Sequence, residues 1–230
     1  MHSQSQTMIT QNSSHQPAVR SGRPVATKIV SLSSSVGIIG ASMPFARNME
    51  IYGENESAEY LYKVISGIVR TYKVLNDGRR QIGSFYLPGD IFGLEFGSEH
   101  TFSAEAIADS KIQVIKRSAV IALAARDKEV ARQLWRMTAT ELQHAQDHIM
   151  LLVKTARERV VGFLLEMAER IGVSEFDLPM SRQDIADYLG LSIETVSRTV
   201  SQLENSGAIA VPTSRHIVLR HRDALNRMNA

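Results

Sequence analysis

The residues best suited to specific chemistry lie on one side of a predicted helix over residues 193–204. The buried side of this helix is marked by apolar side chains at i, i+4 and i+7, namely Val196, Val200 and Leu203. The opposite side then carries Glu194, Ser197 and Arg198. An arginine donates two hydrogen bonds to O6 and N7 of guanine, and a glutamate accepts one from N4 of cytosine. We therefore expect this helix to read base pairs in the major groove of DNA. The other candidate contacts on the helix are Ile193 and Thr195.

A shorter helix precedes this one and is joined to it by a tight turn. Ser181 is its predicted N-cap, and Asp184 three residues later resembles a capping box. Ala186 is small where the second helix must cross closely, and Gly190 can adopt the positive φ of the turn. Ser192 then caps the second helix. A plain pair of helices with a charged outer face is the alternative. Caps on both helices and an arginine on the outer face favour a DNA-binding helix-turn-helix.

Basic residues flank this motif on both sides. Ser181 and Arg182 open the shorter helix and are both candidate DNA contacts. Residues 207–219 are typical of two short strands around a polar turn, with Arg215 and His216 at the tip. Such a wing can place basic side chains against phosphate. The C-terminal segment continues the basic cluster with Arg220, His221, Arg222 and Arg227. On charge alone, a solvated tail is the favoured interpretation of that last segment.

A long helix is predicted upstream, because residues 127–155 contain neither glycine nor proline. Apolar and small residues recur in it at alternating steps of four and three, and the seam comprises Ala131, Trp135, Thr138, Leu142, Ala145, Ile149, Leu152 and Ala156. The helix could pack this seam on its own domain. Alternating four-three spacing favours another helix, so we expect a homodimer interface through Trp135, Leu142, Ala145, Ile149 and Leu152. A second amphipathic helix follows and ends near Gly172.

The N-terminal half of the chain shows strand signals from about residue 29 to residue 116. Asp77-Gly78 between two such segments predicts a hairpin, with Arg79 and Arg80 pointing into solvent. The expected fold is α+β: a disordered tail over 1–27, a β-roll over 28–118, a dimerisation helix region over 119–156, and a winged helix-turn-helix over 157–230.

Composition excludes several classes of protein. The 230 residues contain no cysteine, which excludes disulfides and cysteine-held iron–sulfur clusters. No membrane span and no signal peptide are predicted, so a cytoplasmic protein is expected. Acidic residues and one histidine lie close together at Asp90, Glu95, Glu99, His100 and Glu105. They match no spaced ligand or acid–base motif, so neither an enzyme nor a metal site is expected.

Two segments carry a resemblance to a known family. LGLSIETVSR (Leu189–Arg198) and YLPGDIFG (Tyr86–Gly93) are similar to the cyclic AMP receptor protein/FNR superfamily of bacterial transcription regulators. The pattern Glu194-x-x-Ser197-Arg198 and the segment 183–190 resemble its FixK-type branch, which regulates low-oxygen and nitrogen-fixation genes. The resemblance covers the chain from about residue 28. It implies a homodimer on double-stranded DNA with the sequence TTGA, a spacer and TCAA, and activation through contacts with RNA polymerase.

The cyclic-nucleotide branch of that superfamily binds the phosphate of its ligand through an arginine. This chain has no arginine in the corresponding segment. The corresponding segment, Gly93–Ala104, contains no arginine or lysine. A buried anion without a paired cation is costly. We therefore expect no cyclic-nucleotide effector and no cofactor, with the roll serving as a scaffold. The alternative is a ligand-gated regulator whose roll binds an unidentified small effector.

Overall fold

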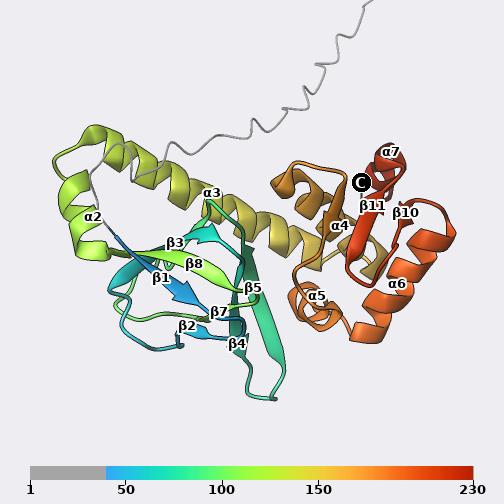
Figure 1. The fold of residues 1–230 in the computed structure, drawn as a ribbon, viewed down its shortest axis with the longest axis horizontal. Coiled ribbons are helices and arrows are strands. Elements are labelled where there is room, and N and C mark those ends of the chain that lie inside the picture. Colours follow the sequence, from blue (N-terminus) through green and yellow to red (C-terminus); the bar gives the residue numbers. More distant parts are fainter. Residues whose placement is uncertain (1–39, 230) are drawn as a thin grey trace, which may run out of the picture.

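The computed structural model describes residues 40–229 (Figure 1). The expected α+β architecture is confirmed: a roll of strands, a long helix and a C-terminal winged helix-turn-helix. The strands are β1 (Ala41–Phe45), β2 (Glu50–Tyr52), β3 (Tyr60–Ser66), β4 (Val69–Val74), β5 (Arg80–Tyr86), β6 (Ile91–Phe92), β7 (Ser103–Ala106), β8 (Ser110–Lys116), β9 (Glu175–Asp177), β10 (Ile209–Ala210) and β11 (His216–Leu219). The helices are α2 (Arg117–Ala124), α3 (Lys128–Leu152), α4 (Ala156–Ile171), α5 (Arg182–Leu189), α6 (Ile193–Asn205) and α7 (Arg222–Asn229). The tail predicted over 1–27 lies outside the described residues.

The roll consists of two four-stranded antiparallel sheets, in the orders β1-β8-β3-β6 and β2-β7-β4-β5. β4 and β5 form the hairpin predicted at Asp77-Gly78, where Gly78 adopts a φ of 83° that favours glycine. Apolar side chains that alternate along the strands fill the space between the sheets. The large aromatic residues of this core are Phe45, Tyr52, Tyr62, Tyr86 and Phe92.

α3 runs from the roll to the C-terminal unit along the length of the molecule (Figure 1). Asp127 caps it by accepting from the backbone N–H groups of Glu129 and Val130. One side of α3 packs on the roll, with Val130 and Met137 buried there. The predicted helix region 119–156 also contains most of α2. The sequence pattern did not predict α2 as a separate helix before α3.

The C-terminal unit contains two elements that the sequence did not indicate. β9 is only three residues long and completes the sheet β10-β11-β9, with Phe176 as its one buried side chain. α7 packs against α4 through Leu225, where a solvated tail was the favoured interpretation. β9 is too short to show a periodic pattern, and α7 buries one apolar side chain, Leu225, among charged residues. Both elements therefore depend on packing against neighbours distant in sequence.

Among residues 40–229, no helix has the length and apolar character needed to cross a membrane.

Candidate nucleic-acid interface

α6 presents a polar outer surface above a buried apolar side. Ser192 caps the helix by accepting from the backbone N–H of Thr195 at 3.2 Å, as expected. The side chains of Glu194, Ser197 and Arg198 are exposed, and no other described residue forms an ion pair with Arg198 within 4 Å. Ile193 is less exposed, at 36% of its surface, and Thr195 is half-buried. The core side comprises Val196, Thr199, Val200 and Leu203.

Hydrogen bonds in the first turn of α6 further stabilise the negative charge of Glu194. Its own backbone N–H and the Ser192 hydroxyl stabilise the carboxylate, and these hydrogen bonds lower the pKa of Glu194. An ionised carboxylate accepts hydrogen bonds only, which matches the exposed amino group of cytosine in the major groove. Glu194 and Arg198 lie one helical turn apart, so they can address neighbouring bases.

The turn between α5 and α6 is held by a residue that sequence reasoning missed. Gly190 ends α5 with a φ of 61°, as the turn requires. The guanidinium of Arg159, on α4, donates from Nη1 to the carbonyl of Leu189 at 2.9 Å and from Nε to the carbonyl of Lys154 at 2.9 Å. Arg159 thereby joins the α3–α4 junction to the turn. No local motif predicts the contact with Leu189, because that residue is 30 positions from Arg159 and belongs to another helix.

Three predicted DNA contacts, from two separate elements, line one surface hollow. Ser181 and Arg182 at the start of α5 and Arg215 on the β10–β11 loop line a hollow of about 170 Å³. Ser181 forms the expected capping box with Asp184, so its hydroxyl already serves the helix. Arg182 is half-buried, and burial lowers its pKa. Its Nη1 has no hydrogen-bond partner among the described residues.

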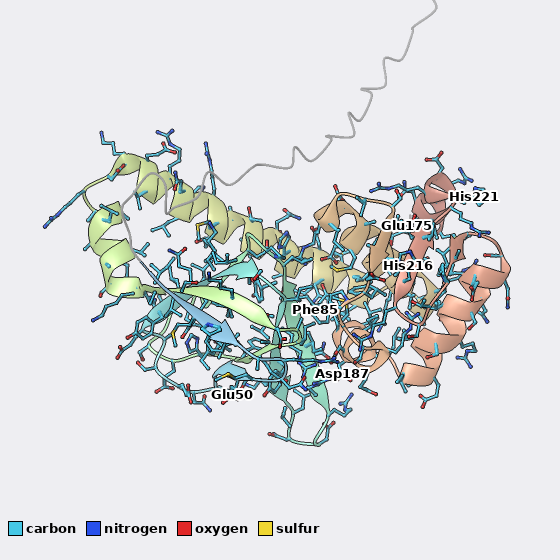
Figure 2. The ribbon with its side chains drawn as sticks, viewed as in Figure 1. Glu50, Phe85, Glu175, Asp187, His216 and His221 are labelled. Carbon is cyan, nitrogen blue, oxygen red and sulfur yellow. The ribbon has the colours of Figure 1, made fainter. Side chains whose placement is uncertain are left out.

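His216 does not belong to this phosphate-facing set. It lies on β11, and its ring nitrogens are each 2.9 Å from a carboxylate oxygen, one of Glu175 and one of Asp177 (Figure 2). Hydrogen bonds from Asp177 and Glu175 raise the pKa of His216. This pairing does not favour the expected contact of His216 with phosphate, because the two carboxylates beside the ring repel an anion. The remaining basic cluster lines a second hollow at α7, formed by Arg220, His221, Arg222, Asp223, Ala224 and Arg227.

The predicted seam on α3 is largely uncovered. Trp135, Leu142 and Ile149 expose 75%, 58% and 61% of their surface, and Ala145 is also exposed. Packing of α3 on its own roll therefore does not account for these side chains. Leu152 differs from them, because it is half-buried close to Gly190. Two exposed apolar residues extend the stripe beyond the seam, and they are Met150 and Val153.

Aromatic rings occupy the interior of the roll, where the cyclic-nucleotide branch holds its ligand. Tyr52 stacks on His100 with ring centroids 3.5 Å apart, and Tyr62 stacks on Phe92 at 5.2 Å. His100 is almost completely buried, and burial lowers its pKa, so the ring is neutral at pH 7. Tyr86 also lies in this cluster and donates its hydroxyl to Glu141 on α3 at 2.8 Å.

The acidic residues of the predicted loop do not converge on a site. Asp90 accepts from Arg170 at 2.6 Å and Glu105 from Arg70 at 2.9 Å, so both form ion pairs within the fold. Glu95 accepts from the Thr101 hydroxyl at 2.8 Å. Across residues 40–229, no group of three or more histidine, aspartate or glutamate side chains is arranged to hold a metal ion.

A roll, a long helix and a winged helix-turn-helix with an exposed base-reading surface define a DNA-binding transcription regulator. Residues 158–228 match the Crp-like helix-turn-helix domain, and residues 43–127 match the cyclic nucleotide-binding domain. The nitrogen fixation regulation protein FixK of Azorhizobium caulinodans is 50% identical over 202 residues, covering 85% of this chain and 82% of that protein. The fumarate and nitrate reduction regulatory protein of Escherichia coli (strain K12) is 32% identical over 199 residues, covering 83% and 79%.

The solved structures agree with these sequence relatives. The structure of FixK2 from Bradyrhizobium japonicum has a TM-score of 0.81 and 52% sequence identity, covering 84% of this chain and 98% of that one. The chain belongs to the CRP/FNR family, and within it the chain is a FixK-like transcription regulator with a helix-turn-helix DNA-binding domain.

Proposed function

We propose that this chain is a cytoplasmic transcription activator of nitrogen-fixation and low-oxygen genes, which binds promoter DNA as a homodimer. The observation that carries the proposal is the exposed surface of α6, where Glu194, Ser197 and Arg198 project together from a helix held rigidly by its buried side. FixK relatives at 50% and 41% identity are named as nitrogen fixation regulators, which supports the choice of genes. Activation through RNA polymerase is inferred from the same kinship.

The DNA site follows from the chemistry of that surface. Arg198 pairs with guanine and Glu194 with the cytosine amino group, while Ile193 or Ser197 lies against a thymine methyl. A half-site with one G·C pair among A·T pairs results, and the sequence TTGA fits it. Two-fold symmetry gives TTGA, a spacer and TCAA. Half-sites one helical turn apart lie about 10 base pairs from centre to centre, which leaves a spacer of about six.

Contacts with the DNA phosphate backbone are assigned to the hollow beside α5. Arg182 and Arg215 both line this hollow, and the N-terminus of α5 adds backbone N–H groups beside Ser181. Phosphate contacts of this kind set the register of the recognition helix without reading sequence. They complement the base contacts of α6 on the same face of the unit.

The homodimer is proposed from the exposed stripe on α3. Large apolar side chains at heptad spacing are costly in water, and a second copy of the helix covers them by two-fold symmetry. Trp135, Leu142, Ala145 and Ile149 form the centre of this proposed interface. Leu152 lies at its end, where it is half-buried close to Gly190 of its own chain.

We further propose that DNA binding needs no cyclic nucleotide and no cofactor. Tyr52, Tyr62, Phe92 and His100 pack the interior of the roll against one another. A ligand would have to displace these rings and would find no arginine between residues 88 and 109 to neutralise its phosphate. This packing favours a scaffold over the ligand-gated alternative.

The experiment that tests the proposal is footprinting on TTGA-N6-TCAA DNA with purified protein and no added ligand. Protection of both half-sites is expected. Arg198→Ala should weaken binding by about 1–3 kcal/mol and lose discrimination at the G·C pair. Arg132→Ala, on the roll end of α3, is the matched control and should bind as the parent does. Full preference for the G·C pair in Arg198→Ala would overturn the assignment of α6.

A further inference from the structure

The β4–β5 hairpin of the roll is joined to α5 by a cluster of five charged side chains. Arg80 Nη2 lies 2.7 Å from an oxygen of Asp184 and 2.7 Å from an oxygen of Asp187. Arg70 pairs with the same Asp184 oxygen through Nη1 and with Glu105 through Nη2 at 2.9 Å. The cluster spans two domains, because both arginines belong to the roll and both aspartates to the helix-turn-helix. The expectation that Arg80 points into solvent is wrong, while Arg79 does so.

The cluster is largely removed from water. Arg70 is 8% exposed and Asp184 is 5% exposed. Burial raises the pKa of the Asp184 carboxyl, but hydrogen bonds from Ser181 and the charges of Arg70 and Arg80 outweigh burial and lower it below its ordinary value. The carboxylate is therefore ionised at neutral pH, and its charge is compensated by the two arginines of the roll. A buried pair of this kind resists separation, because either partner left alone would be an uncompensated charge.

Apolar contacts beside the cluster complete one continuous interface. Phe85 on β5, labelled in Figure 2, packs against Tyr188 on α5 with ring centroids 5.3 Å apart. The amide of Gln81 donates to the carbonyl of Tyr188 at 3.3 Å. His148 on α3 stacks on the other side at 4.0 Å. Tyr188 is therefore enclosed by the roll and by the long helix, and α5 has contacts that oppose both sliding and rotation.

Asp184 has a second role in the same position. Its carboxylate accepts from the backbone N–H of Ser181 at 2.9 Å, which closes the capping box at the start of α5. The roll thus holds the group that starts the first helix of the DNA-binding motif. The outer surface of α6 remains exposed, so these contacts fix the motif without covering its base-reading side.

We propose that Arg70 and Arg80 are positioning residues for DNA recognition, which lock the helix-turn-helix to the roll and thereby set the distance between the two recognition helices of the dimer. The only covalent connection between α3 and α4 is the short segment 153–155, about which the C-terminal unit would otherwise pivot. The inference rests on the proposed binding of a two-fold palindrome, because a fixed helix spacing matters only when both half-sites are read together.

The test is to measure binding to TTGA and TCAA half-sites separated by five, six or seven base pairs. The parent should prefer one spacer by about tenfold or more, since a rigid dimer reads one spacing. Arg80→Asp faces two carboxylates and should reduce that preference to about threefold or less. Asp187→Arg should do the same. The double variant Arg80→Asp/Asp187→Arg restores an opposite-charge pair and should regain most of the preference.

Arg79→Ala is the matched control in the same hairpin, because within residues 40–229 Arg79 forms its ion pair with the exposed Asp77 alone. It should keep the spacer preference of the parent. A general loss of stability would weaken binding to all three spacers equally, so the ratio between spacers reports positioning. The proposed positioning role is overturned if Arg80→Asp keeps the parent's ratio of affinities between spacers. It is also overturned if the double variant recovers none of the spacer preference. Absence of palindrome binding by the parent itself would instead contradict the proposed function.

Discussion

The exposed stripe on α3 gives a quantitative prediction about the dimer. Ile149→Ala removes three carbon groups, each worth about 0.8 kcal/mol on burial. Because Ile149 is 61% exposed in one chain, about 1.5 kcal/mol of that remains for the partner to bury. Two copies give about 3 kcal/mol, so the dimer dissociation constant should rise about 100-fold. Ile149→Asp adds an unpaired buried charge and should leave monomers at all practical concentrations.

Sedimentation velocity over a dilution series measures this dissociation constant directly. Thr140→Asp places the same charge on an exposed side of α3 away from the stripe and should sediment as the parent does. Circular dichroism should show unchanged helix content, since Ile149 contributes little to the fold of one chain. Footprinting of Ile149→Asp should show no protection of the palindrome. An Ile149→Ala dissociation constant within about threefold of the parent would refute the interface, because the buried area could not then be at this position.

Three further predictions concern ligand, salt and pH. Titration calorimetry with cyclic AMP or cyclic GMP should show no heat at millimolar ligand; saturable binding would favour the ligand-gated alternative. Arg215→Ala should lower the slope of log affinity against log salt by about one without changing sequence preference, and an unchanged slope would remove Arg215 from the phosphate contacts. The raised pKa of His216, held by Asp177 and Glu175, should stabilise the wing fully below about pH 6.5 and less as pH rises through the raised value. The melting-temperature difference between the parent and His216→Gln should therefore shrink from pH 6 to pH 9, and a constant difference would contradict this.

The sequence alone was enough to predict the features that depend on neighbouring residues, such as helix periodicity, N-caps and tight turns. The i, i+4, i+7 pattern of α6, the serine caps at Ser181 and Ser192, and the Asp77-Gly78 hairpin all formed as expected, because each depends on residues a few positions apart. The CRP/FNR family was indicated by the resemblance of Leu189–Arg198 and Tyr86–Gly93, and the α+β fold by the strand and helix patterns along the chain. The surface that the proposed function uses was therefore readable from one short stretch of sequence.

Tertiary structure decided which charges are free and which are paired. Arg79 and Arg80 are neighbours of the same type, yet one is solvent-exposed and the other binds aspartates more than 100 positions away. His216 appeared basic in sequence and lies between two carboxylates that a short, unpredicted strand brings to it. Coulomb energy depends on distance and burial, and neither is a local property of the chain. Composition therefore identified the charged residues of this regulator, but only the fold determined that Arg70 and Arg80 hold its two domains together.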